Sequence, residues 1–136
     1  MSGEQSLHLA HVVARSPEAV YRFAVQPANL PRWAAGLASG VREGRDGWWL
    51  CASPLGDVRV RFAPENRFGV LDHTVVLPDG TSVLNPLRVL PHPAGSEVVF
   101  TYRRSPGQDD AAAAADEAAV RADLARLADL LVPGTG

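Results

Sequence analysis

The sequence predicts a single α+β domain in which a curved, seven-stranded antiparallel sheet is covered by a long C-terminal helix. Three observations lead to this prediction. The 136 residues are enough for one hydrophobic core. Short strand-like segments separated by turn residues fill residues 41–104, and an alanine-rich segment then runs into a stripe of leucines. We expect one domain over residues 1–136, with residues 1–5 and 133–136 frayed.

A strand and two short helices are predicted at the start of the chain. Residues 6–14 favour a strand, and the Ser-Pro-Glu of residues 16–18 then supplies a helix cap, a proline at the first helical position and an acid in the first turn. This helix should run to about Val25, because Pro27 stops it. A second helical turn is expected over residues 29–35.

The remaining six strands should form an antiparallel meander. The turn residues of 45–47 (Arg-Asp-Gly) and 78–80 (Pro-Asp-Gly) separate two pairs of them. In residues 58–62, three apolar side chains alternate with Arg59 and Arg61, so one face of the sheet should be exposed to water. After a first segment that begins at residue 41, the strands are expected over residues 48–52, 58–62, 69–77, 81–90 and 97–104.

The last helix should start at Asp109 or Asp110 and reach Val132. Residues 120, 124, 127 and 131 form an apolar stripe along one face, made of one valine and three leucines. The polar residues Asp116, Asp123, Arg126 and Asp129 should mark the solvent side. We also expect the small alanine side chains near the mouth of the sheet to leave space for a cavity.

Composition excludes several function classes. All thirteen basic residues are arginine, so neither a lysine Schiff base nor a P-loop is available. The net charge of −2 and the dispersed arginines give no basic stripe for nucleic acid. No apolar run approaches the ~18 residues of a membrane span, and the polar start of the chain is unlike a secretory signal, so we expect a cytoplasmic protein.

Several segments resemble the START-like or SRPBCC superfamily, and specifically a bacterial subgroup labelled polyketide cyclase-like whose reaction is not established. The resemblance lies in residues 16–23, 29–33, 66–73, 85–89 and 97–101, read together with the order of predicted elements. It implies a helix-grip fold with a ligand cavity between the sheet and the terminal helix. The superfamily includes aromatic polyketide cyclases, lipid and hormone carriers, quinone-binding proteins and co-chaperones, so the fold does not choose the function.

Metal and covalent chemistry are disfavoured. His8 and His11 lie three residues apart on one strand and should point to opposite faces, and His92 should lie in a turn, so we expect no metal and no cofactor. Cys51 cannot form an intramolecular disulfide and should be a buried, inert thiol. Residues 36–40 only approach a nucleophile elbow, with Ser39 misplaced. Noncovalent proton transfer remains for any reaction.

Strand alternation selects candidate site residues. His73, Phe100, Tyr102 and Arg104 should face inward, and His73 is the best catalytic candidate because its ordinary pKa of ~6.5 suits acid–base work. The alternative is a core histidine satisfied by a carbonyl. Tyr102 can hydrogen-bond a ligand oxygen or simply pack in the core.

Further candidates are Asn85, Arg88, Trp33 and Trp49. Asn85 either faces the cavity or caps a turn, and Arg88 and Arg104 either hold a ligand carboxylate or phosphate or form salt bridges. Trp33 and Trp49 supply apolar walls. Trp48 and Trp49 must face oppositely, so one of them should lie on the outer side of the sheet. There it should be exposed, or contribute to a homodimer interface, or be covered by the terminal segment.

The favoured function is the binding of a small hydrophobic molecule, aromatic, polyketide-like or lipid, in an apolar cavity. The first alternative is a cyclase or dehydratase-type lyase in which His73 moves a proton while Tyr102 or Asn85 steadies an enolate. The second alternative is a protein-interaction module of the co-chaperone kind, which would use the outer sheet face around Arg59 and Arg61.

Overall fold

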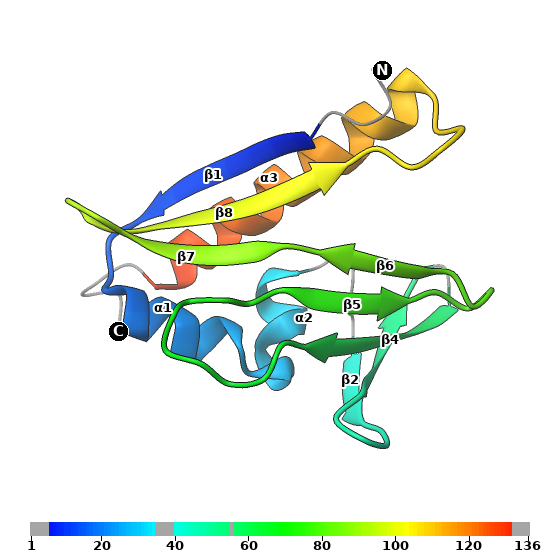
Figure 1. The fold of residues 1–136 in the computed structure, drawn as a ribbon, viewed down its shortest axis with the longest axis horizontal. Helices are drawn as coiled ribbons and strands as arrows, with labels where there is room; N and C mark the ends of the chain where they lie inside the picture. Colours follow the sequence, from blue (N-terminus) through cyan, green and yellow to red (C-terminus); the bar gives the residue numbers. More distant parts are fainter. Residues whose placement is uncertain (1–5, 35–39, 55, 132–136) are drawn as a thin grey trace.

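A computed structural model of the chain describes residues 6–34, 40–54 and 56–131 and shows an α+β fold with antiparallel sheets and a long C-terminal helix (Figure 1). The expected frayed ends, residues 1–5 and 133–136, the elbow-like Ser39 and the predicted helix end at Val132 lie outside the described residues. The described strands are β1 (Ser6–Val13), β2 (Gly40–Glu43), β3 (Trp49–Ser53), β4 (Gly56–Phe62), β5 (His73–Val76), β6 (Ser82–Asn85), β7 (Leu87–His92) and β8 (Gly95–Arg103). The helices are α1 (Pro17–Ala24), the short 3-10 turn η2 (Pro27–Asn29), α2 (Leu30–Trp33) and α3 (Asp110–Leu130).

The described strands form two sheets, so the prediction of one seven-stranded sheet was wrong. One sheet has the order β1-β8-β7 and the other β2-β3-β4-β5-β6. The predicted strand 81–90 is interrupted at Pro86, so β6 pairs with β5 in one sheet and β7 pairs with β8 in the other. The predicted strand 69–77 is interrupted as well, because β5 starts only at His73.

The break in both strands has a local chemical cause. Pro86 has no N–H to donate to a ladder. Beside it, the side chain of Asp72 takes the place of a backbone partner, since its Oδ1 accepts from the Leu87 N–H at 2.9 Å. The same carboxylate forms a bidentate pair with Arg88, with N···O distances of 2.8 and 2.7 Å. Asp72 therefore fastens the junction of β5 and β7 where the sheets separate.

The segment after β1 forms three short pieces rather than the two predicted helices. Ser16 caps α1 as expected, its Oγ accepting from the Ala19 N–H at 3.3 Å. Pro27 ends the first helical segment but also starts the turn η2, which leads directly into α2. This extra turn arises because a proline is well suited to the first position of a helical turn.

The predicted hairpin turns are confirmed. Asp46 and Gly47 both have positive φ angles, 56° and 81°, and the Gly44 N–H donates to the Trp48 carbonyl at 2.8 Å. Gly80 has a φ of 90°, and its N–H donates to the carbonyl of Leu77 at 2.9 Å. These positive angles are the reason that glycine is favoured at such turn positions.

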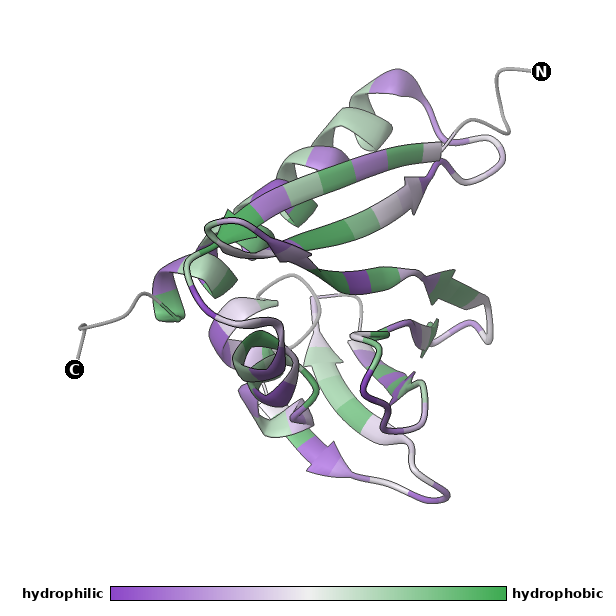
Figure 2. Cartoon of the chain, turned by 60° about the vertical axis from the view of Figure 1, so that its left-hand side comes forward, coloured by the Kyte–Doolittle hydropathy of each residue, from purple (hydrophilic) through white to green (hydrophobic). Residues whose placement is uncertain are grey.

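Helix α3 lies across β1 and β8 on one face of the three-stranded sheet (Figure 1). Asp109 caps it, with Oδ1 accepting from the Ala112 N–H at 2.8 Å. The predicted apolar stripe is confirmed, because Leu124, Leu127 and Leu131 are buried. Along β1, hydrophobic and hydrophilic residues are interspersed (Figure 2), and Leu9 and Val13 are buried in the core.

The outer face of the five-stranded sheet carries Trp48. The Arg59 and Arg61 guanidinium carbons lie 5.1 and 4.4 Å from its ring centroid. Trp49 instead shares strand alternation with the buried Cys51, so the two tryptophans face oppositely as predicted. Among the described residues, no helix is long and apolar enough to cross a membrane.

Candidate functional site

A cavity of about 400 Å³ lies between the two sheets and α3. Residues of both β6 and β8 line it, and these two strands separate beyond Pro86. The Thr101 N–H still donates to the Pro86 carbonyl at 3.0 Å, whereas β6 pairs with β5 beyond that point. The lining comes from α2, β5, β6, β7, β8 and α3 and the segments beside them. It consists of Leu30, Trp33, Ala34, His73, Val83, Leu84, Asn85, Leu87, Phe100, Thr101, Tyr102, Arg103, Ser105, Asp116, Ala119, Val120, Asp123 and Leu124.

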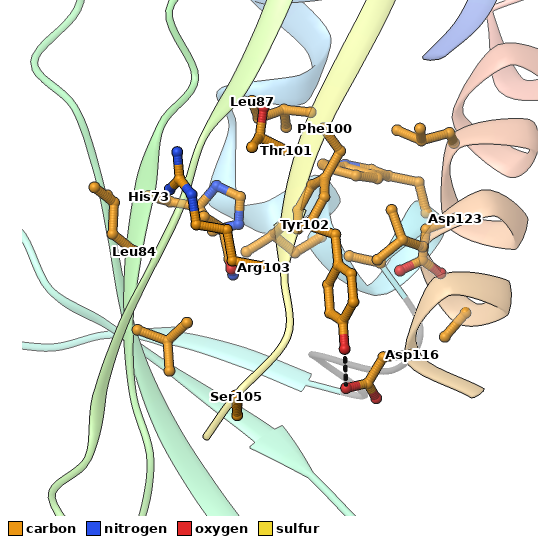
Figure 3. Close-up of a pocket in the computed structure, with 18 residues that line it drawn as sticks. His73, Leu84, Leu87, Phe100, Thr101, Tyr102, Arg103, Ser105, Asp116 and Asp123 are labelled. Atoms are coloured by element: carbon orange, nitrogen blue, oxygen red, sulfur yellow. Dashed lines mark hydrogen bonds between the residues drawn. The ribbon is translucent and has the colours of Figure 1, made fainter. Parts of the chain in front are cut away.

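Phe100 and Tyr102 project from β8 into the middle of the site. Figure 3 shows them between His73 on one side and Asp116 and Asp123 of α3 on the other. The two aromatic residues have the same strand parity, which places both on the concave side. They divide a buried end, near His73, from an outer end formed by exposed residues such as Asp116.

His73 is the buried titratable group of the site, with only 7% of its surface exposed. Its Nδ1 lies 3.0 Å from the Leu71 carbonyl oxygen. Because a carbonyl can only accept, Nδ1 must donate, and Nε2 of the neutral ring is then a hydrogen-bond acceptor. Burial lowers the pKa of His73, although the bond to Leu71 and the charge of Asp72 oppose that shift. The imidazole is therefore neutral at pH 7.

Aromatic rings hold the imidazole in place. The ring centroid of Phe62 lies 5.2 Å from that of His73, and the centroid of Phe100 lies 6.5 Å away. Phe62 and Asn85 are the cross-strand partners of His73 on β4 and β6. His73 is thus fixed by a hydrogen bond at one nitrogen and by packing on its sides.

Trp33 contributes a buried donor. Its side chain is 4% exposed, and Nε1–H has no hydrogen-bond partner among the described residues. The residue is held through its backbone, since Arg126 Nη1 donates to the Trp33 carbonyl at 2.8 Å. The same Arg126 nitrogen donates to Asp123 Oδ1 at 2.9 Å, which ties α2 to α3.

A hydrogen-bonded group closes the outer end of the site. Tyr102 Oη donates to Gln108 Oε1 at 2.9 Å and lies 3.4 Å from Asp116 Oδ2, the contact drawn in Figure 3. Gln108 Nε2 donates to the same Asp116 oxygen at 2.6 Å. Burial, with the charge of Asp116, raises the pKa of Tyr102, so the phenol stays protonated.

Five of the eight predicted ligand-binding residues lie together in the cavity lining, namely Trp33, His73, Asn85, Phe100 and Tyr102. Trp49, Arg88 and Arg104 are not part of this lining. Arg88 pairs with Asp72, as described above. Arg104 pairs with Asp110 at 2.7 Å and donates from Nε to the Gln108 carbonyl at 2.9 Å.

Asp116 and Asp123 were predicted to mark the solvent side of the last helix; Asp116 is exposed as predicted, whereas Asp123 is not. Both line the cavity, and the Asp123 side chain is half-buried. Their spacing in the sequence indicates this position, because Asp116 lies four residues before Val120 and Asp123 lies three residues after it. Residues three and four apart share a helix face, so these carboxylates belong to one edge of the apolar stripe.

The described residues offer little for metal or thiol chemistry. Among them, no group of three or more His, Cys, Asp and Glu side chains is placed to hold a metal ion. His8 Nδ1 lies 3.0 Å from Thr101 Oγ1 on the outer face, while His11 has the opposite strand parity. Cys51 is fully buried, and burial raises the pKa of its thiol, so the thiolate is disfavoured.

Comparison with known proteins shows the fold. No family model matches the chain, and no curated protein matches it. Protein CV1439 from Chromobacterium violaceum is 18% identical, with a TM-score of 0.67, over 94% of this chain and 98% of that one. An uncharacterised protein from Bacillus thuringiensis is 13% identical, with a TM-score of 0.72, over 93% and 98%. DynU16, a protein in the dynemicin biosynthetic locus, is 13% identical, with a TM-score of 0.69, over 93% of this chain and 46% of that one.

Proposed function

We propose that this chain is a single START-like domain whose cavity binds a small, largely apolar molecule without forming a covalent bond to it. The observation that carries the proposal is the cavity of about 400 Å³, with mostly apolar walls and a buried indole N–H that lacks a partner among the described residues. Ligand sites in proteins commonly have this volume and this mixture of apolar walls and a few polar groups.

Two further observations support a ligand site rather than a packing defect. The His73 ring is held by its bond to Leu71, and the backbone of Trp33 is held by the bond from Arg126 to its carbonyl. Such support from neighbouring groups is what a preorganised binding site requires. The shared fold with DynU16, from a biosynthetic locus, supports a small molecule as the partner.

Ligand recovery is the direct test. The purified protein is analysed by native mass spectrometry, and the denatured protein is extracted with solvent. We expect a bound small molecule or, for protein that has lost it, a thermal shift with members of an aromatic and lipid panel. An empty protein that shows no shift with any member would contradict the proposal.

Two neighbouring alanines of α3 provide a matched control. Both alanines are exposed, but Ala119 lines the cavity and Ala118 does not. Ala119→Phe should fill the space and abolish the thermal shift, while Ala118→Phe should leave it unchanged. Equal binding by the two variants would place the ligand elsewhere.

A cyclase or dehydratase-type reaction is the second candidate, and the orientation of His73 favours it. A neutral imidazole whose Nδ1 is held by a carbonyl presents Nε2 as a general base. The phenol of Tyr102, in contrast, is already bonded to Gln108. His73→Phe should abolish turnover of a cyclisable substrate while the protein stays folded. Unchanged turnover would rule out this role.

A further inference from the structure

His73 and Trp33 both line the cavity, are both buried, and have opposite hydrogen-bonding character. His73 Nε2 is an acceptor, because Nδ1 donates to Leu71 and burial keeps the ring neutral. Trp33 Nε1–H is only a donor. A molecule that satisfies both must itself offer one donor and one acceptor.

The Trp33 donor provides a reason for selectivity. A buried N–H without a partner is costly, and a ligand acceptor placed against it removes that cost. Sites built to hydrogen-bond a polar group discriminate strongly against analogues that lack it, since the protein group is then left unpaired. Carbonyl oxygen is the acceptor that matches an otherwise apolar ring system.

Charge in the lining argues for a neutral ligand. Arg88 and Arg104, the residues expected to hold a carboxylate, are paired with Asp72 and Asp110 outside the lining. Arg103 borders the cavity but is exposed, and its Nε donates to Ser6 Oγ at 3.0 Å.

The helix wall carries carboxylates instead. Asp116 lies beside Gln108 at the outer end, and Asp123 is paired with Arg126. A ligand carboxylate would therefore be repelled by Asp116, and the arginine of the lining, Arg103, is already bonded to Ser6.

The cavity size suits a fused ring system. A cavity of 150 Å³ holds benzene, so about 400 Å³ corresponds to roughly two to three fused rings. Leu87, Phe100 and Leu124 supply apolar walls for such rings.

We infer that the cavity selects a neutral, fused-ring ligand whose buried edge carries a hydroxyl group that donates to His73 Nε2 and a carbonyl oxygen that accepts from Trp33 Nε1–H. This inference rests on the proposed function and adds the chemistry and orientation of the ligand. Asn85, opposite His73 on β6, lies beside the same edge.

Matched tricyclic probes test the inference by isothermal titration with the whole protein. The reference probe is hydroxyfluorenone with the hydroxyl meta to the carbonyl. Fluorenone lacks its hydroxyl, the methyl ether blocks that hydroxyl, and hydroxyfluorene lacks the carbonyl. Fluorenone carboxylate adds a negative charge. We expect hydroxyfluorenone to bind about 3- to 10-fold more tightly than either the ether or hydroxyfluorene, one hydrogen bond being lost in each case. The carboxylate should bind most weakly.

Two variants assign each preference to its residue. His73→Phe should remove the preference for hydroxyl over ether, and Trp33→Phe should remove the preference for ketone over hydroxyfluorene. His92→Phe and Trp48→Phe, at positions outside the cavity lining, are the controls and should keep both preferences.

The outcomes separate this inference from the proposed function. If the probes bind equally to the unaltered protein, or the preferences survive His73→Phe and Trp33→Phe, the hydroxyl–carbonyl inference is overturned while ligand binding stands. If no probe binds and no ligand is recovered, both are overturned. Should a variant fail to fold, the ranking of the probes on the unaltered protein decides.

Discussion

Replacing Asp72 tests whether one carboxylate holds the junction between the two sheets. The side chain accepts from the Leu87 N–H at 2.9 Å and pairs with Arg88 through two bonds of 2.8 and 2.7 Å. Leu87 is fully buried, so its N–H depends on this acceptor. Asp72→Ala removes all three bonds, whereas Asp72→Asn keeps an oxygen for Leu87.

The size of the effect follows from the two kinds of bond. Leaving the Leu87 N–H without a partner costs about 1–3 kcal/mol. The ion pair is half-exposed on the Arg88 side, so its loss adds only about 0.2–1 kcal/mol. The Asp72→Ala variant should therefore lose about 2–3 kcal/mol of unfolding free energy, and Asp72→Asn about 1 kcal/mol.

Urea unfolding followed by tryptophan fluorescence measures this loss. Asp57→Ala is the matched control, because Asp57 pairs with Arg42 at 3.5 Å with both side chains well exposed. That variant should stay within about 0.5 kcal/mol of the unaltered protein. If Asp72→Ala costs no more than Asp57→Ala, the reasoning about the junction is refuted.

Three further predictions concern stability. Because the pKa of His73 is lowered in the folded protein, the unfolded chain binds more protons just below pH ~6.5, and the free energy of unfolding should fall as the pH drops through that range. Urea titrations at several pH values measure this fall, which should be absent from His73→Phe. Gly69 has a φ of 75°, and an added methyl group would overlap a backbone oxygen of β7, so Gly69→Ala should lower the free energy of unfolding by about 2–3 kcal/mol in urea unfolding. Gly80 has a φ of 90° with open space around it, so Gly80→Ala should cost only about 1 kcal/mol. Leu127→Ala should cost about 2–5 kcal/mol by thermal unfolding, whereas Leu130→Ala, at a partly exposed position, should cost under about 1 kcal/mol.

Much of the fold could be predicted because its causes are local. The cap at Asp109 and the stripe of Leu124 and Leu127 depend on neighbours within one or two helical turns. Strand alternation likewise placed His73 among buried residues. The split into two sheets has one cause that the sequence shows, Pro86, and one that it does not, because Asp72 must reach a backbone group fifteen residues away.

The site was harder to predict for a related reason. A sequence shows that an arginine is present but not which acid it meets. Arg88 and Arg104 were candidates for a ligand carboxylate, and the structure pairs them with Asp72 and Asp110. Asp123 carried a readable signal in its spacing from the leucine stripe, but helix periodicity alone does not say whether the flank of a stripe faces water or a cavity.

The junction at Asp72 also positions part of the cavity lining. Successive residues of a strand point to opposite faces, so Asp72 fastens β7 from one side while His73 enters the cavity from the other. Before Pro86, β6 pairs with β5 rather than with β8, and residues of both β6 and β8 line the cavity. Asp72 therefore connects the stability of the fold to the position of His73.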